Sequence, residues 1–100
     1  MKILSLRALR GPNFWSNWRH QLIVMQLDLE EMEYYPSNGI EGFTERLETL
    51  IPSLYEHRCS RGYPGGFIER LKEGTWMGHI IEHVALELQV LAGMQCGFGR

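Results

Sequence analysis

Three side chains between positions 79 and 83 have the types and the spacing of a metal hydrolase. His79, Glu82 and His83 form the order His-x-x-Glu-His, which is the reverse of the His-Glu-x-x-His pattern of zinc hydrolases. On an α-helix the two histidines lie about 40° apart on one face, so both imidazoles can reach one metal ion. The carboxylate beside them can take a proton from metal-bound water. The pattern therefore predicts His79 and His83 as metal ligands and Glu82 as a general base.

Zinc suits this pattern, because a site with three protein ligands keeps one position open for water and lowers the pKa of that water to about 7. The third ligand is open between Cys59 and His57, which both lie in the breaker-rich loop of residues 57–66. Cys59 can equally be a small buried hydrophobic residue. Glu87 is a further candidate, although a carboxylate that orients His83 is the better role for it. A purely structural helix with unrelated histidines is the alternative to a metal site.

The motif belongs to a helix that we expect over residues 75–92. Thr75 is the expected N-cap, and Gly93 is the expected C-cap. Seven apolar residues fall within an arc of about 140°, which predicts the buried face of this helix: Ile80, Ile81, Val84, Ala85, Leu88, Leu91 and Ala92. The histidines lie on the opposite side, which we expect to be partly buried in a cleft.

The remaining elements predict an α/β (α+β) fold. Residues 2–9 and 21–29 have the composition of strands and can pair as a long hairpin. Ser37 and Asn38 are expected caps for a helix over residues 39–50, and a further helix is expected over residues 67–72. We therefore expect one compact domain over residues 1–100, with a small sheet covered by helices.

Two groups of charged residues are candidates for binding a substrate. Glu30 and Glu31 belong to an acidic cluster that is either a solvated strand end or a surface for arginine-rich ligands. Arg58 and Arg61 lie in the loop that precedes the motif, where they can meet carboxylates.

Composition excludes several functional classes. The chain has 100 residues and a formal net charge of -2, which gives no reason to expect nucleic acid or an anionic membrane as a partner. Its two cysteines, Cys59 and Cys96, do not form a disulfide framework. No apolar run approaches 18 residues, and no signal peptide is evident. A cytoplasmic location is therefore expected. The sequence is compatible with a homo-oligomer without indicating one.

Several long blocks of this sequence resemble the amino-terminal domain of cyanophycin synthetases. The blocks occur in the right order and cover nearly the whole chain: MKILSLRALRGPNFWS, QLIVMQLDLEE, PSNGIEGF, LIPSLYEHRCSRGYPGGF, EGTWMGHIIEHVALELQVLAGM and the GFGR tail. Cyanophycin, the polymer that this family makes, has a polyaspartate backbone whose side chains carry arginine through isopeptide bonds. Members of the family are large cytoplasmic ligases with an ATP-grasp domain and a Mur-ligase-like domain, which consume ATP with magnesium.

The resemblance implies that this domain binds the polymer. In members that keep the His-x-x-Glu-His pattern, it resembles a metallopeptidase that cuts cyanophycin into primers. His79 and His83 match its metal-binding positions, and Glu82 matches its catalytic carboxylate. Cys59 falls in the family's His-x-Cys-Ser loop, which places it first as the third ligand.

The length of the chain limits what the resemblance predicts. There is no phosphate-binding Gly-x-x-x-x-Gly-Lys loop and no room for the ATP-dependent domains, so ligase activity is not expected from these residues alone. We expect the whole amino-terminal domain of the family to be longer than this chain, which is therefore either a fragment or a short homologue. Two functions remain: a zinc hydrolase of cyanophycin, and a non-catalytic module that holds the polymer for ligase domains located elsewhere.

Overall fold

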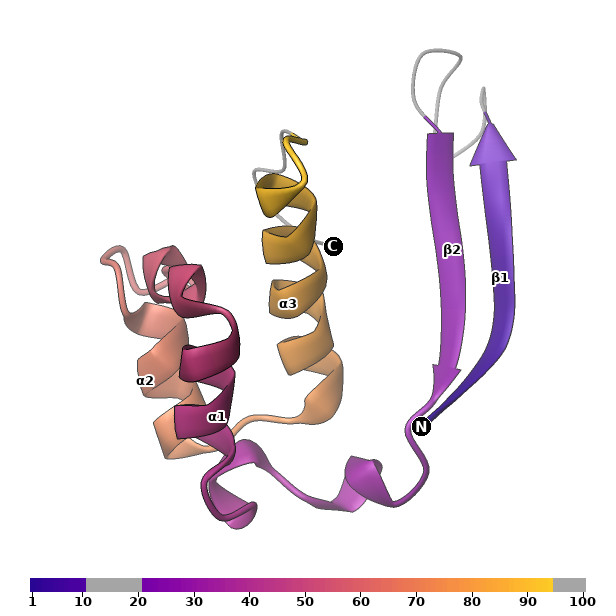
Figure 1. Ribbon diagram of the computed structural model, residues 1–100. Helices are drawn as coiled ribbons and strands as arrows, with labels where there is room; N and C mark the ends of the chain where they lie inside the picture. Colours follow the sequence, from indigo (N-terminus) through magenta and orange to yellow (C-terminus); the bar gives the residue numbers. More distant parts are fainter. Residues whose placement is uncertain (11–20, 95–100) are drawn as a thin grey trace. The chain divides into compact units, whose positions relative to one another are not determined.

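The computed structural model describes residues 1–10 and 21–94, and these residues have an α+β fold. The expected fold class is therefore confirmed. The chain divides into two compact units, Met1–Met32 and Glu33–Arg100, which are described separately here. Figure 1 shows the strands and helices of the two units.

The first unit is an antiparallel hairpin of strands β1 (Lys2–Arg10) and β2 (Gln21–Asp28). Apolar side chains face each other across it, as in the pairs Leu6↔Met25 and Ala8↔Ile23. The register shifts between Ile3 and Ser5, which marks a bulge. The expected strands and their hairpin pairing are confirmed. The residues between the strands lie outside the described part of the chain.

The hairpin is followed by a short 3-10 helix, η1 (Glu30–Tyr34), that runs across the boundary between the units. Glu30 has a positive φ of 53° and lies close to the start of the chain. Its carboxylate accepts a hydrogen bond from the amino group of Met1 at 3.0 Å and pairs with Lys2 Nζ at 3.3 Å. These contacts tie the first strand to the end of the second.

The second unit contains three α-helices, α1 (Phe43–Leu50), α2 (Gly66–Glu73) and α3 (Met77–Leu91). Two short 3-10 helices, η2 (Ser37–Gly39) and η3 (Pro52–Glu56), connect and support them. Helix α1 packs against α2, and η3 packs against all three α-helices (Figure 1). The core of this unit is formed by six side chains that are at most 5% exposed: Leu54, Phe67, Ile68, Leu71, Met77 and Ile80.

The expected helix over residues 39–50 begins later than predicted, at Phe43. Its N-cap is Gly42, whose φ of 71° interrupts any helix that would start at Gly39. Ser37 and Asn38 do not cap this helix. Ser37 Oγ donates to Leu71 O at 2.7 Å and Asn38 Nδ2 donates to Glu73 O at 2.9 Å, so both side chains satisfy carbonyl groups at the end of α2.

Helix α3 lies within the predicted range, but its expected cap and buried face were wrong in part. The N-cap is Trp76 rather than Thr75, and it makes no capping hydrogen bond through its side chain. The C-cap is Ala92 rather than the predicted Gly93, which follows it with φ 91°. Of the predicted apolar arc, Ile80 is buried, whereas the four residues nearest the end of the helix are exposed: Ala85, Leu88, Leu91 and Ala92.

The physical reason is that α3 meets the core with its first turns and with its histidine side. Phe67 lies fully buried against this side, where its ring stacks on the ring of His83 with centroids 4.0 Å apart. The predicted partial burial of the histidine side is therefore confirmed. The face was misplaced because helical periodicity identifies apolar residues but does not identify which face another element covers.

Candidate metal centre

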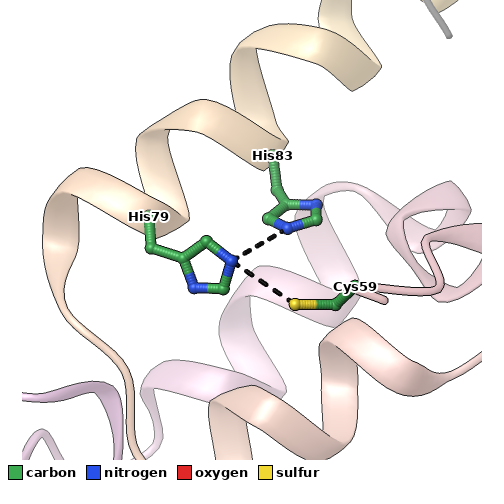
Figure 2. Close-up of side chains that lie close together, drawn as sticks. All are labelled: Cys59, His79 and His83. Carbon is green, nitrogen blue, oxygen red and sulfur yellow. Dashed lines mark hydrogen bonds between the residues drawn. The ribbon is translucent and has the colours of Figure 1, made fainter. Parts of the chain in front are cut away.

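Three side chains from two separate segments converge at the start of α3 (Figure 2). His79 and His83 lie one turn apart, and their Nε2 atoms are 3.1 Å apart. Cys59 reaches them from the loop before α2, with Sγ 3.4 Å from His79 Nε2. The ligand atoms of all three residues lie within 4.8 Å of one another. The structure therefore brings together the two predicted histidines and the cysteine ranked first as the third ligand.

These distances fit a zinc ion. A tetrahedral zinc ion, with bonds of about 2.0–2.1 Å to nitrogen and about 2.3 Å to sulfur, sets neighbouring ligand atoms about 3.3–3.6 Å apart. Two edges of the cluster, at 3.1 Å and 3.4 Å, already approach these separations. Two imidazoles and one thiolate are also a donor set that zinc prefers. The residues are thus suited to hold zinc, with a fourth position left for water or substrate.

The position of Cys59 depends on a tightly folded loop. Cys59 and Ser60 both have positive φ values, 48° and 61°, which residues other than glycine rarely adopt. A hydrogen bond from Phe67 N–H to His57 O at 3.1 Å joins the ends of the loop, and one from Arg61 N–H to Arg58 O at 3.0 Å closes a turn within it. Unfavourable backbone conformations persist where the surroundings enforce them, and they occur often at functional sites.

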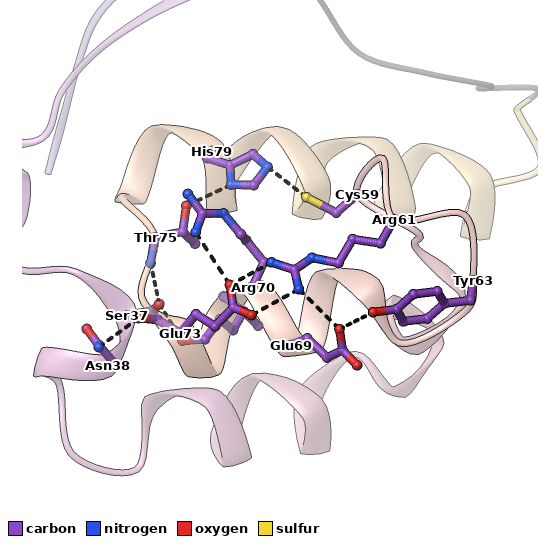
Figure 3. Close-up of polar contacts among 11 residues, drawn as sticks. Ser37, Asn38, Cys59, Arg61, Tyr63, Glu69, Arg70, Glu73, Thr75 and His79 are labelled. Atoms are coloured by element: carbon purple, nitrogen blue, oxygen red, sulfur yellow. Dashed lines mark hydrogen bonds and ion pairs between the residues drawn. The ribbon is translucent and has the colours of Figure 1, made fainter.

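Each histidine of the cluster has a partner for its other ring nitrogen. Thr75 Oγ1 lies 2.8 Å from His79 Nδ1, and His57 Nδ1 lies 2.8 Å from His83 Nδ1. Thr75 is itself held in place, because its backbone N–H donates to Ser37 Oγ and its carbonyl accepts from Ser37 N–H (Figure 3). With both Nδ1 atoms engaged, both Nε2 atoms face the centre of the cluster. Such outer partners orient the ligands of a metal site.

Burial shifts the pKa values of two members of the cluster towards their uncharged forms. Burial, together with the charges of His79 and His57, lowers the pKa of His83 to about 4, so its ring is neutral at neutral pH. Burial raises the pKa of the Cys59 thiol, an effect that the charges of Arg70 and Arg61 oppose and that of Glu82 reinforces. A neutral histidine is ready to bind a metal, whereas the thiol needs a nearby cation to become a thiolate.

Glu82 is placed beside this cluster without a fixed role in the packing. It is half-buried on α3, and its charge acts on Cys59. Within residues 1–10 and 21–94, its carboxylate forms neither a hydrogen bond nor an ion pair. A carboxylate without a structural partner is available to exchange a proton with water near the metal position.

The predicted substrate-binding residues are engaged to different degrees. Arg61 donates to Glu73 through Nη1 at 2.9 Å and through Nη2 at 2.6 Å, and its Nη1 also pairs with Glu69 (Figure 3). This side chain therefore braces the loop against α2. Arg58 is exposed and donates from Nη1 to Gly62 O at 3.1 Å. Its guanidinium group remains accessible.

The acidic candidates belong to the other unit. The carboxylate of Glu30 is neutralised by the amino group of Met1, whose hydrogen bond is the largest cause that lowers its pKa, and by Lys2. Glu31 is exposed. Of these two, Glu31 keeps the more accessible carboxylate.

Sequence reasoning missed the residues that support the ligands. Thr75 was expected to cap α3, but it contacts His79 instead. His57 was a candidate ligand and proves to be a partner of His83. Glu87 was expected to orient His83, and it contacts His57 rather than His83 itself. The one available signal was spacing, since Glu87 lies one turn beyond His83 on the same side of the helix.

The comparisons with known proteins identify the family of the chain. The family described as cyanophycin synthase-like N-terminal domain matches residues 24–100. The chain belongs to this family. The cyanophycin synthetases of Geminocystis herdmanii, Synechocystis sp. and Crocosphaera subtropica are each 62% identical to it over all 100 residues.

The chain spans only 11–12% of the length of these relatives. It matches them along its entire length, which includes the loop of Cys59 and the His-x-x-Glu-His motif. None of the helices in the described part of the chain combines the length and the hydropathy that a membrane span requires.

Proposed function

We propose that this domain is a zinc-dependent hydrolase that cuts cyanophycin, the polymer of aspartate and arginine, into short primers for synthesis. The observation that carries the proposal is the convergence of the ligand atoms of Cys59, His79 and His83 within 4.8 Å, with Glu82 on the helix of the two histidines and without a partner in the described part of the chain. We infer cyanophycin as the substrate because the chain belongs to the cyanophycin synthase-like N-terminal domain family.

In the proposed reaction, each group of residues in this chain has its own role. Cys59, His79 and His83 would hold the zinc ion, which would supply a Lewis acid to polarise a carbonyl group and acidify water. Glu82 takes the proton from the attacking water and returns it to the leaving amine. Arg58, whose guanidinium group is accessible, attracts carboxylates of the polymer, and the exposed Glu31 attracts its arginine side chains.

Metal content is the first test. Elemental analysis of the purified protein should find about one zinc per chain, and the His79→Ala/His83→Ala double variant should contain none. Both proteins should be supplied with zinc before analysis, and their folding should be compared by circular dichroism. A folded wild-type protein that takes up no zinc would contradict the metal centre.

Glu82→Gln separates catalysis from binding. This variant should retain zinc and polymer but lose cleavage by a factor of at least about 100, because general base catalysis contributes about 10²–10⁴-fold. Cleavage is measured by the appearance of short arginine-aspartate fragments from purified polymer. Cleavage at the wild-type rate would show that Glu82 is not the base. Polymer binding without cleavage by the zinc-loaded wild type would favour the non-catalytic module.

A further inference from the structure

A chain of hydrogen bonds extends from His83 away from the metal position. His83 Nδ1 lies 2.8 Å from His57 Nδ1, and His57 Nε2 lies 2.7 Å from Glu87 Oε2. Glu87 is only 6% exposed, although it is a charged residue on the last helix of the unit. Hydrogen bonds from Ser53 and His57 lower the pKa of its carboxyl group, so it is ionised. Burying a charged carboxylate lowers the stability of a protein unless the carboxylate is paired and hydrogen-bonded.

The hydrogen bond between the two Nδ1 atoms can run in either direction, and the protonation of His57 decides which. An ionised carboxylate only accepts hydrogen bonds, so His57 must present a proton on Nε2 to Glu87. When His57 carries this one proton only, its Nδ1 is unprotonated and accepts a hydrogen bond from His83 Nδ1. His83 therefore carries its proton on Nδ1, and its Nε2 lone pair faces Cys59 and His79. The opposite direction would place a proton on His83 Nε2 and exclude a metal ion.

We propose that Glu87 and His57 are positioning residues that select the metal-binding tautomer of His83. This inference rests on the proposed zinc site, and it adds two residues that do not touch the metal. Glu87 acts on the metal position only through His57. The ring of His83 is held from its other side by Phe67, which stacks on it with an interplanar angle of 23°. Phe67 thus sets the orientation of the His83 ring, and His57 sets its tautomer.

The test is zinc affinity, measured by competition with a chromophoric chelator. Glu87→Gln keeps the shape of the side chain but can donate to His57, so it removes the preference for one tautomer. We expect zinc to bind this variant about 10–100-fold more weakly, as is typical when an outer partner of a ligand is lost. Glu45→Gln is the matched control, because Glu45 is exposed on α1, and its affinity should equal that of the wild type.

Two substitutions at His57 distinguish positioning from packing. Asn places a hydrogen-bonding atom near the position of imidazole Nδ1, where it can still accept from His83. Gln places one near the position of Nε2, where it can reach only Glu87. We therefore expect His57→Asn to bind zinc at least several-fold more tightly than His57→Gln. Thermal unfolding of each metal-free variant shows whether the two differ in stability.

A direct readout is the position of the protons in the zinc-loaded wild-type protein. Nitrogen NMR of ¹⁵N-labelled histidine should show His83 protonated on Nδ1 and His57 protonated on Nε2. Equal zinc affinity in Glu87→Gln and the wild type, or a proton on His57 Nδ1 alone, would overturn the positioning role while leaving the metal centre intact. A wild-type protein without zinc would overturn the metal centre and this role together.

Discussion

His83 is the residue on which most of the site depends. Its Nε2 faces the metal position, its Nδ1 contacts His57, and its ring stacks on the fully buried Phe67. Each contact removes one degree of freedom from the side chain. A ligand held in this way needs little reorganisation when a metal binds, because the entropy of ordering it has been lost during folding.

The low pKa of His83 predicts how stability depends on pH. Its pKa is about 4 in the folded protein and about 6.5 in an unfolded chain. Between these values the unfolded chain binds a proton that the folded protein does not, so the free energy of unfolding falls as the pH falls from 6.5 to 4. The metal-free protein should therefore melt at a lower temperature at pH 5 than at pH 7.5. In His83→Gln this difference should shrink, and an unchanged difference would assign the effect to other groups.

A cysteine close to a histidine, as Cys59 is to His79, can be a nucleophile as well as a metal ligand. Substitutions at Cys59 distinguish these two roles. Asp can replace Cys as a zinc ligand and tolerates the left-handed backbone at this position, whereas Ser is a poor ligand. We expect Cys59→Asp to retain measurable zinc binding and cleavage, and Cys59→Ser to lose both at least tenfold more severely. If both variants bind zinc but neither cleaves, the thiol itself takes part in the reaction.

At the scale of elements, the site depends on the contact between the Cys59 loop and the start of α2. Gly66 makes this contact possible, since a Cβ atom at this position would lie 2.0 Å from the carbonyl oxygen of Arg58. No side chain fits there without displacing the loop backbone. The geometry of the third ligand is therefore encoded partly by a glycine that does not touch it.

A pair of glycine substitutions tests this dependence. Gly66→Ala should displace the loop, lower the free energy of unfolding by about 1–3 kcal/mol and weaken zinc binding. Gly78 is the matched control, because it lies in α3 with no atom within 4 Å of an added Cβ. Gly78→Ala should be neutral or stabilising by up to about 1 kcal/mol and should leave zinc affinity unchanged. Calorimetry and chelator competition measure both quantities, and wild-type zinc affinity in Gly66→Ala would refute the proposed dependence.

At the scale of the whole molecule, the core and the candidate metal centre belong to the same unit. Among the described residues, all buried hydrophobic side chains and all three metal-ligand candidates lie within Glu33–Arg100. The hairpin unit exposes apolar side chains on both strands, such as Leu6 and Ile23. The site is thus built by the packing of the helical unit.

This division predicts the behaviour of a shortened chain. A protein that contains residues 33–100 alone should keep its helical circular dichroism spectrum and bind zinc within about tenfold of the full-length affinity. Its unfolding should remain cooperative, because the core side chains are all retained. Loss of helix content or of zinc binding would show that the helical unit requires the hairpin.

The local elements were predictable because their signals are local. Alternating apolar residues indicated the two strands, and helical periodicity indicated α2 and α3 to within two residues at each end. The cap assignments failed for a different reason. Ser37 and Thr75 have side chains suited to caps, but Ser37 Oγ bonds to Leu71 O and to the N–H of Thr75, both more than 30 positions away, and Thr75 Oγ1 contacts the ring of His79. Long-range hydrogen bonds leave no trace in a local pattern.

The sequence by itself placed His79, Glu82 and His83 on one side of a helix, because helical geometry brings residues three and four positions apart onto one face. It also determined the family, since the matching blocks extend through the chain. Only the tertiary structure decided that Cys59 rather than His57 completes the cluster, and that His57 connects Glu87 to His83. The reason is that the Cys59 loop and α3 are about 20 residues apart in sequence and meet through the packing of Phe67 between them.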